Sequence, residues 1–209
     1  MRSVVATEPD LLPPCPGFSD ARRRVFEAAI VLFGERGYHA VSVRDLATKI
    51  GLTPMAIYAH VASKQDLLFE IMTIGHTTHR DRLSGALLDA GPEPEEQIRA
   101  LCRAHVLVHL EYPALARVTN REAGALGQTQ TAVIQRLRAE AGKVFRDVVT
   151  RGQKRCAFTD DNPTLLVQAV GGMGIRAAEW WTPAVGISVE EVVETFADFA
   201  VRILTACHR

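Results

Sequence analysis

The sequence is poor in cysteine, and none of its four cysteines forms a CxxC pair with another. The scattered positions and the lack of CxxC spacing argue against a disulfide framework or a structural zinc knuckle. Long apolar runs are also missing, since the longest, residues 28–33, is far shorter than the roughly 18 residues that a membrane span needs. Residues 1–16 lack the apolar centre of a signal peptide. We therefore expect a cytoplasmic protein with no membrane partner.

The chain has no excess charge of either sign, with 24 basic and 24 acidic residues. This balance argues against attraction of the whole molecule to nucleic acid, so any such contact has to come from a local patch. The sequence has no GxSxG or HExxH motif and no pair of acids at a catalytic spacing. The run from Gly171 to Gly174 follows no strand, so it predicts close helix packing rather than a phosphate loop. We expect no enzymatic activity and no cofactor.

What the chain has instead is helical sequence in long, proline-poor segments. They are rich in Ala, Leu, Glu, Arg and Gln, which favour helix, and breakers such as Gly91-Pro92 and Tyr112-Pro113 separate them. These segments are residues 63–90, 94–111, 128–153, 163–181 and 188–207. Together with the helices of the N-terminal part, they predict an all-α protein of about nine helices.

The first 18 residues differ from the rest because four of the ten prolines lie there. This density disfavours both helix and strand, so we expect a flexible arm over residues 1–18. A helix is expected to follow: Ser19 can cap it, and apolar residues from Val25 to Phe33 recur at steps of three and four. Gly37 can end this helix.

Residues 42–64 contain two short helical patterns joined by a tight turn. Ser42 and Asp45 form a variant of the capping box at the start of the first pattern. Gly51 supplies the turn, and Thr53 can cap the second pattern. This order of parts predicts a helix-turn-helix.

The second helix of this motif has the dimensions to enter the major groove of DNA. A helix about 10–12 Å across matches a groove of roughly 12 Å, while the residues around it bind phosphate. Ile57 is expected to point inward, which leaves its neighbours on the outward face. The side chains with donors for phosphate are Ser42, Arg44, Thr53, Tyr58, His60 and Lys64.

The charge of this region is weakly positive. Residues 19–64 hold seven basic and four acidic residues, which predicts moderate affinity for each DNA-binding head and a need for two heads. Arg22, Arg23 and Arg24 leave two interpretations open. They bind phosphate or a neighbouring minor groove, or they are a solvated run of charge.

The order of parts over residues 21–72 resembles the DNA-binding domain of the TetR family of transcriptional regulators. The matching pieces are LFGERGYHAVSV, RDLATKIGLT, the tyrosine that ends the second helix, and SKQDLL. The resemblance implies a homodimeric repressor with one recognition helix per subunit and a helical C-terminal domain that binds a small-molecule effector. From their positions in the motif, the resemblance implies that the six donor side chains named above contact the DNA backbone. It also implies that Pro54, Met55 and Ala56 contact the bases. Because Met55 and Ala56 are apolar, we expect contact with thymine methyl groups.

We therefore expect a head of three helices over residues 19–62 and an effector-binding and dimerisation bundle over residues 63–209. In the dimer, the last two helices are expected to pair across a two-fold axis, so that the heads meet successive turns of palindromic double-stranded DNA. The apolar residues available for this pairing are Leu166, Val167, Val170, Ile175, Val192, Val193, Phe196, Phe199 and Ile203.

The candidate effector site combines apolar and polar side chains. They are Phe69, Met72, Cys102, His105, His109 and Trp180, and the spacing does not decide whether Trp180 or Trp181 faces the site. His105 and His109 have the i,i+4 spacing of metal ligands, with His76 and His79 on the preceding helix. No carboxylate completes a ligand set, so we interpret the histidines as core or pocket-lining groups and expect no metal.

Two other classes of function remain open. A helical adaptor for a protein partner would show no salt-dependent affinity for DNA. A small-molecule-binding protein with a vestigial head would bind a ligand without an operator. The sequence does not identify the operator, the effector or the regulated genes.

Overall fold

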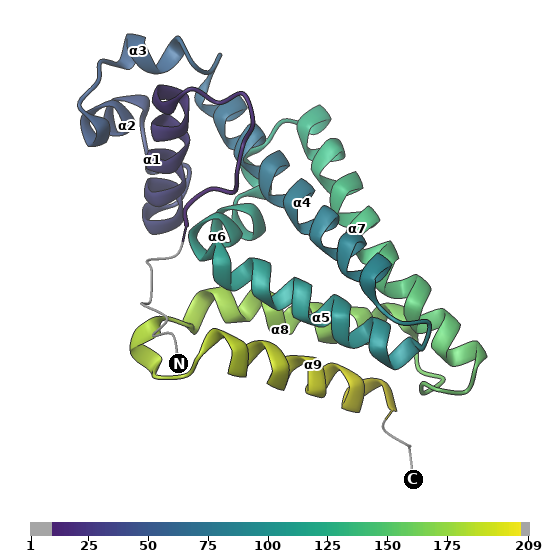
Figure 1. Ribbon diagram of the computed structural model, residues 1–209. Coiled ribbons are helices and arrows are strands. Elements are labelled where there is room, and N and C mark those ends of the chain that lie inside the picture. The colour runs from purple at the N-terminus through teal and green to yellow at the C-terminus, as the bar shows by residue number, and fades with distance from the viewer. Residues whose placement is uncertain (1–9, 206–209) are drawn as a thin grey trace. The chain divides into compact units, whose positions relative to one another are not determined.

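The computed structural model describes residues 10–205, and within them it contains nine α-helices and two short 3₁₀ helices (Figure 1). The α-helices are α1 (Asp20–Arg36), α2 (Val43–Ile50), α3 (Pro54–Tyr58), α4 (Lys64–Asp89), α5 (Pro94–Glu111), α6 (Pro113–Arg121), α7 (Gln128–Lys154), α8 (Pro163–Trp180) and α9 (Val189–Thr205). The 3₁₀ helices are η1 (Ala123–Ala125) and η2 (Pro183–Val185). The predicted all-α class is confirmed, and no helix in the described range is long and apolar enough to cross a membrane.

The predicted helical segments agree with the observed helices to within a few residues, except that α6 was not predicted as a separate helix. Tyr112-Pro113 was interpreted as a breaker between segments. Pro113 instead occupies the first turn of α6, where its missing N–H is no loss. The last residues of the segment 188–207 lie outside the described range.

Contacts divide the described chain into two compact units. The N-terminal unit contains residues 10–78 and 112–138, and the C-terminal unit contains residues 79–111 and 139–205. Helices α4 and α7 each contribute to both units. The division therefore differs from the expected single boundary at residue 62, because α6 packs against α1 in the N-terminal unit.

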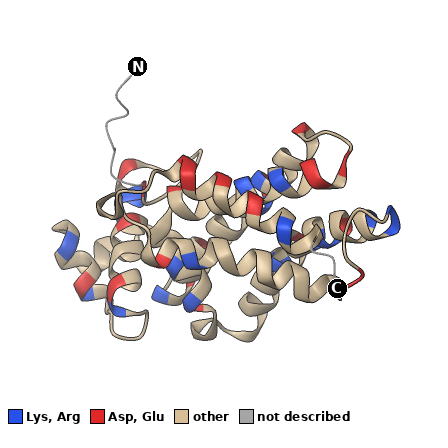
Figure 2. Ribbon diagram, turned by 90° about the horizontal axis from the view of Figure 1, so that it is seen from below, with Lys and Arg blue, Asp and Glu red and all other residues tan. Residues whose placement is uncertain are grey.

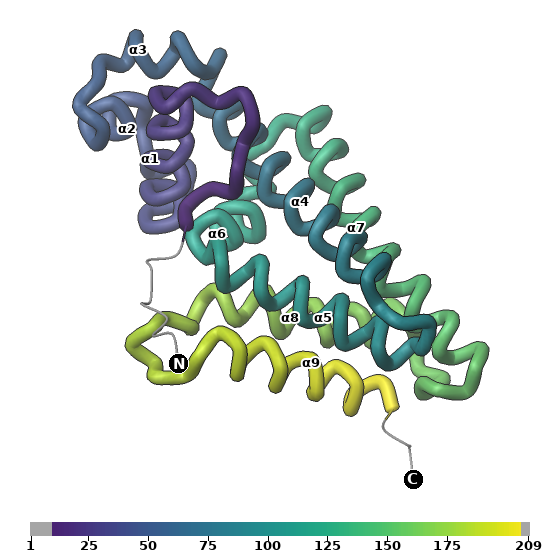
Figure 3. Tube along the Cα trace, viewed as in Figure 1, coloured from purple at the N-terminus to yellow at the C-terminus, as the bar shows by residue number. Residues whose placement is uncertain are grey.

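The segment before α1 is packed rather than flexible where it is described. Leu12 is only 1% exposed, and the Phe18 ring meets the Phe26 ring edge to face, with 4.8 Å between centroids. Arg23 of α1 donates a hydrogen bond to the Leu12 carbonyl at 2.7 Å. The prediction of a flexible arm is therefore wrong for residues 10–18, whose trace can be followed in Figure 3, because a segment without helix or strand can still bury an apolar side chain. The rest of the predicted arm lies outside the described residues.

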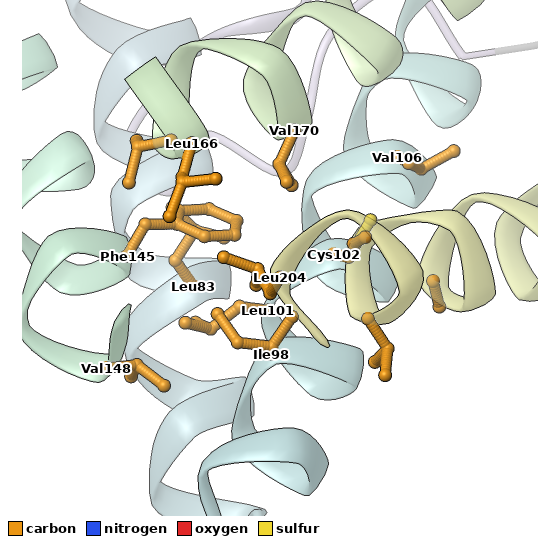
Figure 4. Close-up of a cluster of buried hydrophobic side chains, with 14 of the residues drawn as sticks. Leu83, Ile98, Leu101, Cys102, Val106, Phe145, Val148, Leu166, Val170 and Leu204 are labelled. Carbon is orange, nitrogen blue, oxygen red and sulfur yellow. The ribbon is translucent and has the colours of Figure 1, made fainter. Parts of the chain in front are cut away.

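The core of the C-terminal unit joins α4, α5, α7, α8 and α9. Figure 4 shows part of it, with Leu83, Leu101, Phe145, Val170 and Leu204 directed toward a common centre. Burying each side chain of this size stabilises the fold by about 1.5–3 kcal/mol.

The same core changes the expectation for the dimer surface. Five of the apolar residues expected to pair between subunits are buried within the chain instead: Leu166, Val167, Val170, Val192 and Val193. Their faces pack against α5, which the sequence pattern of one helix does not reveal. The exposed large apolar side chains of α8 and α9 are Leu165, Trp180 and Phe199.

Acidic and basic residues occur near one another along several helices (Figure 2). Within the C-terminal unit, Arg80 pairs with Glu140 at 3.1 Å and Arg103 pairs with Glu194 at 2.6 Å. These pairs are partly exposed to solvent and contribute little stability each.

Candidate DNA-binding surface and histidine cluster

The start of α2 is fixed by a reciprocal pair of hydrogen bonds. The Ser42 hydroxyl accepts from the Asp45 N–H at 3.2 Å, and the Asp45 carboxylate accepts from the Ser42 N–H at 2.7 Å. The predicted capping box is therefore confirmed. At the other end, Gly51 has a φ of +69°, and the Leu52 N–H returns to the Ala47 carbonyl at 2.9 Å. This left-handed turn reverses the chain toward α3.

Helix α3 presents one buried side and one exposed side. Thr53 caps it by accepting from the Ala56 N–H at 3.3 Å, and Ile57 is completely buried. Met55 is 78% exposed and Tyr58 is 48% exposed. The predicted orientation of this helix is confirmed for these residues. The remaining members of the predicted face are more varied: Pro54 is exposed, whereas Ala56 and His60 are half-buried.

The two hydroxyl groups that cap α2 and α3, those of Ser42 and Thr53, are not equivalent. The Ser42 hydroxyl donates its proton to the Asp45 carboxylate at 2.5 Å, and the hydrogen bonds from Ser42 lower the pKa of Asp45. The Thr53 hydroxyl is used as an acceptor by the Ala56 N–H, which leaves its own proton free to donate. Thr53 can therefore cap α3 and bind a phosphate oxygen together, whereas Ser42 would first have to release Asp45.

Lys64 is engaged within the N-terminal unit. Its ammonium group donates to the Tyr38 carbonyl at 2.8 Å and to the Val41 carbonyl at 2.6 Å, and it lies 3.9 Å from the centroid of the Tyr38 ring. Burial lowers the pKa of Lys64. The side chain ties the loop before α2 to the first turn of α4. The geometry thus places Lys64 in a positioning role for the helix-turn-helix.

The three consecutive arginines of α1 are also engaged. Arg22 donates to the His60 carbonyl at 2.8 Å and forms an ion pair with Glu70, and Arg24 donates to the Ile50 carbonyl at 2.9 Å. Arg23 donates to the Leu12 carbonyl, and Arg24 remains exposed while Arg22 and Arg23 are half-buried, so both interpretations left open by the sequence stay predictions. The guanidinium groups connect α1 to the segments around it.

The positive charge that remains exposed is therefore smaller than the count of basic residues implies. Arg44 and Lys49 are exposed on α2. Lys49 was not among the predicted DNA-binding residues, and its position in the last turn of α2 is the only sequence signal that could have drawn attention to it.

Three histidine rings meet within the C-terminal unit. His79 comes from α4, and His105 and His109 come from α5. The His79 Nε2 and His105 Nδ1 atoms are 2.8 Å apart, and one potential ligand atom from each of the three residues lies within 4.8 Å of the others. His105 and His109 are buried. The sequence paired His105 with His109 correctly but did not single out His79 from His76.

The surroundings of the cluster keep the buried rings neutral. Burial lowers the pKa of His105 well below its usual value, and the nearby rings of His109 and His79 lower it further. Burial also lowers the pKa of His109. His105 Nε2 donates to the Gly171 carbonyl at 2.9 Å, and His109 Nδ1 donates to the His105 carbonyl at 2.7 Å. These two carbonyls fix which nitrogen of each ring carries the proton.

The other predicted effector-binding residues are distributed over both units. Phe69 is half-buried and Met72 is fully buried in the N-terminal unit. Cys102 is buried in the core of the C-terminal unit, its thiol donates to the Phe196 carbonyl at 3.3 Å, and burial raises its pKa to about 12. Trp180 is 39% exposed, whereas Trp181 is buried and donates from its indole nitrogen to the Ile187 carbonyl at 3.0 Å.

A surface hollow of about 390 Å³ lies in the C-terminal unit, between the end of α4 and the first half of α5. Its lining includes Asp89, Glu96, Arg99 and Arg103, and none of the predicted effector-binding residues.

Two short capped helices joined at a left-handed glycine, the second of them exposed along one side, form a helix-turn-helix, an arrangement that many DNA-binding proteins share. Comparison with known families gives the same class. Residues 25–71 match the family described as bacterial regulatory proteins, tetR family, and residues 91–204 match the tetracyclin repressor-like C-terminal domain. The chain belongs to the TetR family of transcriptional regulators.

Individual relatives match over nearly the whole chain. The chain is 22% identical to the HTH-type transcriptional repressor KstR2 of Rhodococcus jostii, with 92% of this chain and 95% of the relative covered. The structure of the ketosteroid transcriptional regulator KstR2 of Mycobacterium tuberculosis superposes with a TM-score of 0.80 at 21% identity, over 95% of this chain and all of the other. AibR in complex with isovaleryl coenzyme A and operator DNA superposes with a TM-score of 0.77 at 22% identity, over 90% of this chain and all of the other.

Proposed function

We propose that the protein is a transcriptional repressor that binds a palindromic operator as a homodimer, with α3 of each subunit in the major groove. The exposed face of α3 is the observation that carries this proposal, because Met55 and Tyr58 project from a helix whose other side is buried at Ile57. A recognition helix needs this combination of a fixed base and a free face. The similarity to KstR2 repressors supports the same role. It is a regulatory role without catalysis.

The surface geometry divides the candidate DNA-binding residues into three groups. Arg44, Thr53 and Tyr58 are exposed and have donors to offer, so we assign them to phosphate. Ser42 and Lys64 already donate within the chain, so we assign them to positioning the motif. We assign Pro54, Met55 and Ala56 to the major groove of the DNA, and His60 to its edge.

We propose further that a small-molecule effector releases the repressor from its operator. The effector would act by a population shift, stabilising a separation of the two heads that no longer matches successive major grooves. Within the C-terminal unit, Cys102, His105 and His109 remain the proposed polar anchors, and Trp180 the proposed apolar contact. Acyl coenzyme A thioesters are the first class to test, because AibR, a relative in fold, has been captured with one.

The proposal is tested by binding of the protein to duplexes from the region upstream of its own coding sequence. Tyr58→Ala should weaken binding at least 10-fold, since it removes an exposed donor from the end of α3. Leu88→Ala is the matched control, because Leu88 is another exposed large side chain but lies near the end of α4 in the C-terminal unit. Equal affinity of wild type and Tyr58→Ala would contradict the contact assignment. A thermal-shift screen with acyl coenzyme A thioesters tests the effector class.

A further inference from the structure

The histidine cluster brings one potential ligand atom from each of three rings within 4.8 Å of the others. A carbonyl oxygen can only accept a hydrogen bond, so the protons of His105 and His109 lie on the nitrogens that face Gly171 and the α5 backbone. The other nitrogen of each neutral ring, Nδ1 of His105 and Nε2 of His109, therefore carries a lone pair. His79 Nε2 donates a hydrogen bond to that lone pair of His105 at 2.8 Å, and it becomes a metal ligand when its proton moves to Nδ1 of the same ring.

This pattern is characteristic of metal-binding histidines. In such sites each imidazole usually donates its second nitrogen to a carbonyl or carboxylate, which orients the ring and fixes its tautomer. Here His105 and His109 both have that outer contact, and both contacts are backbone carbonyls. The centroids of the three rings are 4.6–5.5 Å apart.

We propose that His79, His105 and His109 form a binding site for one divalent transition-metal ion, with Zn²⁺ as the ion that fits best. Three imidazoles with one open position are a common set for Zn²⁺. Tetrahedral Zn–N bonds of about 2.0–2.1 Å place ligand nitrogens roughly 3.3 Å apart. The ligand atoms, within 4.8 Å of one another, reach that spacing by small ring rotations.

The protein is shaped to hold the central ring of this site. A Cβ atom at Gly174 would come within 2.4 Å of the His105 ring, so the glycine in α8 leaves the room that the imidazole occupies. The close packing predicted for the run from Gly171 to Gly174 is thereby confirmed at Gly174 but not at Gly171 or Gly172, where a Cβ would meet nothing within 4 Å. His79 is only half-buried, which provides a route for the ion. A bound ion would connect α4 to α5.

This three-histidine site was not predicted from the sequence, because a carboxylate was expected as the ligand that would complete a site with His105 and His109. The third ligand is instead a histidine from the preceding helix, whose approach depends on how α4 packs against α5. The site does not depend on the proposed repressor function, and its test contains neither DNA nor an organic effector.

The test is a titration of untagged, chelator-treated full-length protein with Co²⁺, followed by displacement with Zn²⁺. Cobalt is the probe because a tetrahedral Co²⁺ site absorbs visible light. We expect one Co²⁺ per chain, its displacement by one Zn²⁺, and a rise in the melting temperature with Zn²⁺. His79→Gln should weaken the affinity at least 10-fold, and His109→Gln should do the same, which keeps the test valid if one variant folds poorly.

His39→Gln is the matched control, since His39 is exposed in the N-terminal unit. It should bind Co²⁺ as the wild type does. The proposal would be overturned by a wild type that binds no Co²⁺ at tenfold excess over the chain, or by folded His79→Gln and His109→Gln variants with unchanged affinity. Loss of binding in His39→Gln would also overturn it, because the ion would then sit on surface histidines.

Discussion

Lys64 and Arg44 are both basic residues of the helix-turn-helix, but the structure gives them different surroundings. Lys64 donates to two backbone carbonyls of the loop before α2, while Arg44 is exposed on α2. Lys64→Met should lower the free energy of unfolding by about 1–2 kcal/mol, because two carbonyls lose a charged donor. Arg44→Met should leave it within about 0.5 kcal/mol, as is usual for an exposed residue. Urea denaturation of the two variants measures this difference.

The same pair separates a positioning role from a phosphate contact. Arg44→Met should reduce the slope of log affinity against log salt by about 0.9 per subunit, since one phosphate contact is lost. Lys64→Met should weaken binding while leaving that slope unchanged. A slope reduced by Lys64→Met and not by Arg44→Met would reverse the two assignments.

Donor types can be predicted from sequence, but whether a donor is already used cannot. The carbonyls that accept from Lys64 belong to Tyr38 and Val41, more than 20 positions earlier in the chain. The carbonyl that accepts from Arg22 belongs to His60. Local sequence patterns do not indicate hydrogen bonds between residues so far apart in the chain. Counting basic residues therefore overestimates the positive charge that is available to bind DNA.

The buried histidines make stability depend on pH. In the unfolded chain an imidazole binds a proton below its usual pKa, near 6.5, whereas in the folded chain the pKa values of His105 and His109 are lowered. The unfolded state therefore binds more protons between pH 6.5 and the folded-state pKa values. The free energy of unfolding should fall as the pH falls below 6.5, by up to about 1.4 kcal/mol per pH unit for each ring.

Urea denaturation between pH 7.5 and 5, in the presence of a chelator, measures this dependence. His109→Gln should make the curve shallower by the contribution of one imidazole. A curve that is flat in this range, or that rises toward low pH, would show that the rings are protonated in the folded protein.

At the scale of elements, the helix ends were the most predictable part of the fold because caps and turns are local. Ser42 with Asp45, Gly51 and Thr53 all take the positions that their residue types favour. The short helix α6 was the exception, because its first residue is Pro113, and proline occurs both between helices and in the first turn of a helix. The packing partners of each helix were not predictable from its own apolar stripe.

Two glycines in different backbone conformations give an element-level prediction. Gly51 has a φ of +69°, so Gly51→Ala should cost about 1 kcal/mol although a Cβ there meets nothing within 4 Å. Gly85 lies inside α4, and a Cβ there also meets nothing within 4 Å. Gly85→Ala should therefore stabilise the protein by about 0.5–1 kcal/mol. Thermal or urea denaturation of both variants should give shifts of opposite sign, and shifts of the same sign would contradict the turn geometry.

At the scale of the whole molecule, the sequence predicted the class of protein but not the division into units. Residues 112–138 join the N-terminal unit through contacts between distant parts of the chain. The histidine cluster likewise needs α4, α5 and α8 together, which explains why His79 was not singled out. Long-range packing of this kind leaves no periodic signal in one sequence.

The exposed apolar residues of α8 and α9 give a prediction for the assembly. Phe199 is exposed in the single chain, beside an α9 face that is otherwise buried. If α8 and α9 form the dimer surface, Phe199→Arg should convert the dimer to a monomer, because a charge would be buried at its centre without a partner. Leu88→Arg is the control and should leave the dimer intact. Light scattering gives the mass directly, and a dimeric Phe199→Arg would place the interface elsewhere.

The claim that matters most is that residues 42–64 present α3 to double-stranded DNA from each half of a symmetric pair. An equilibrium titration of a palindromic duplex, taken from the upstream region and repeated at several salt concentrations, tests it most directly. The account predicts two chains per duplex and an affinity that falls steeply as salt rises. A protein that stays monomeric, or that binds no duplex even at low ionic strength, would contradict it.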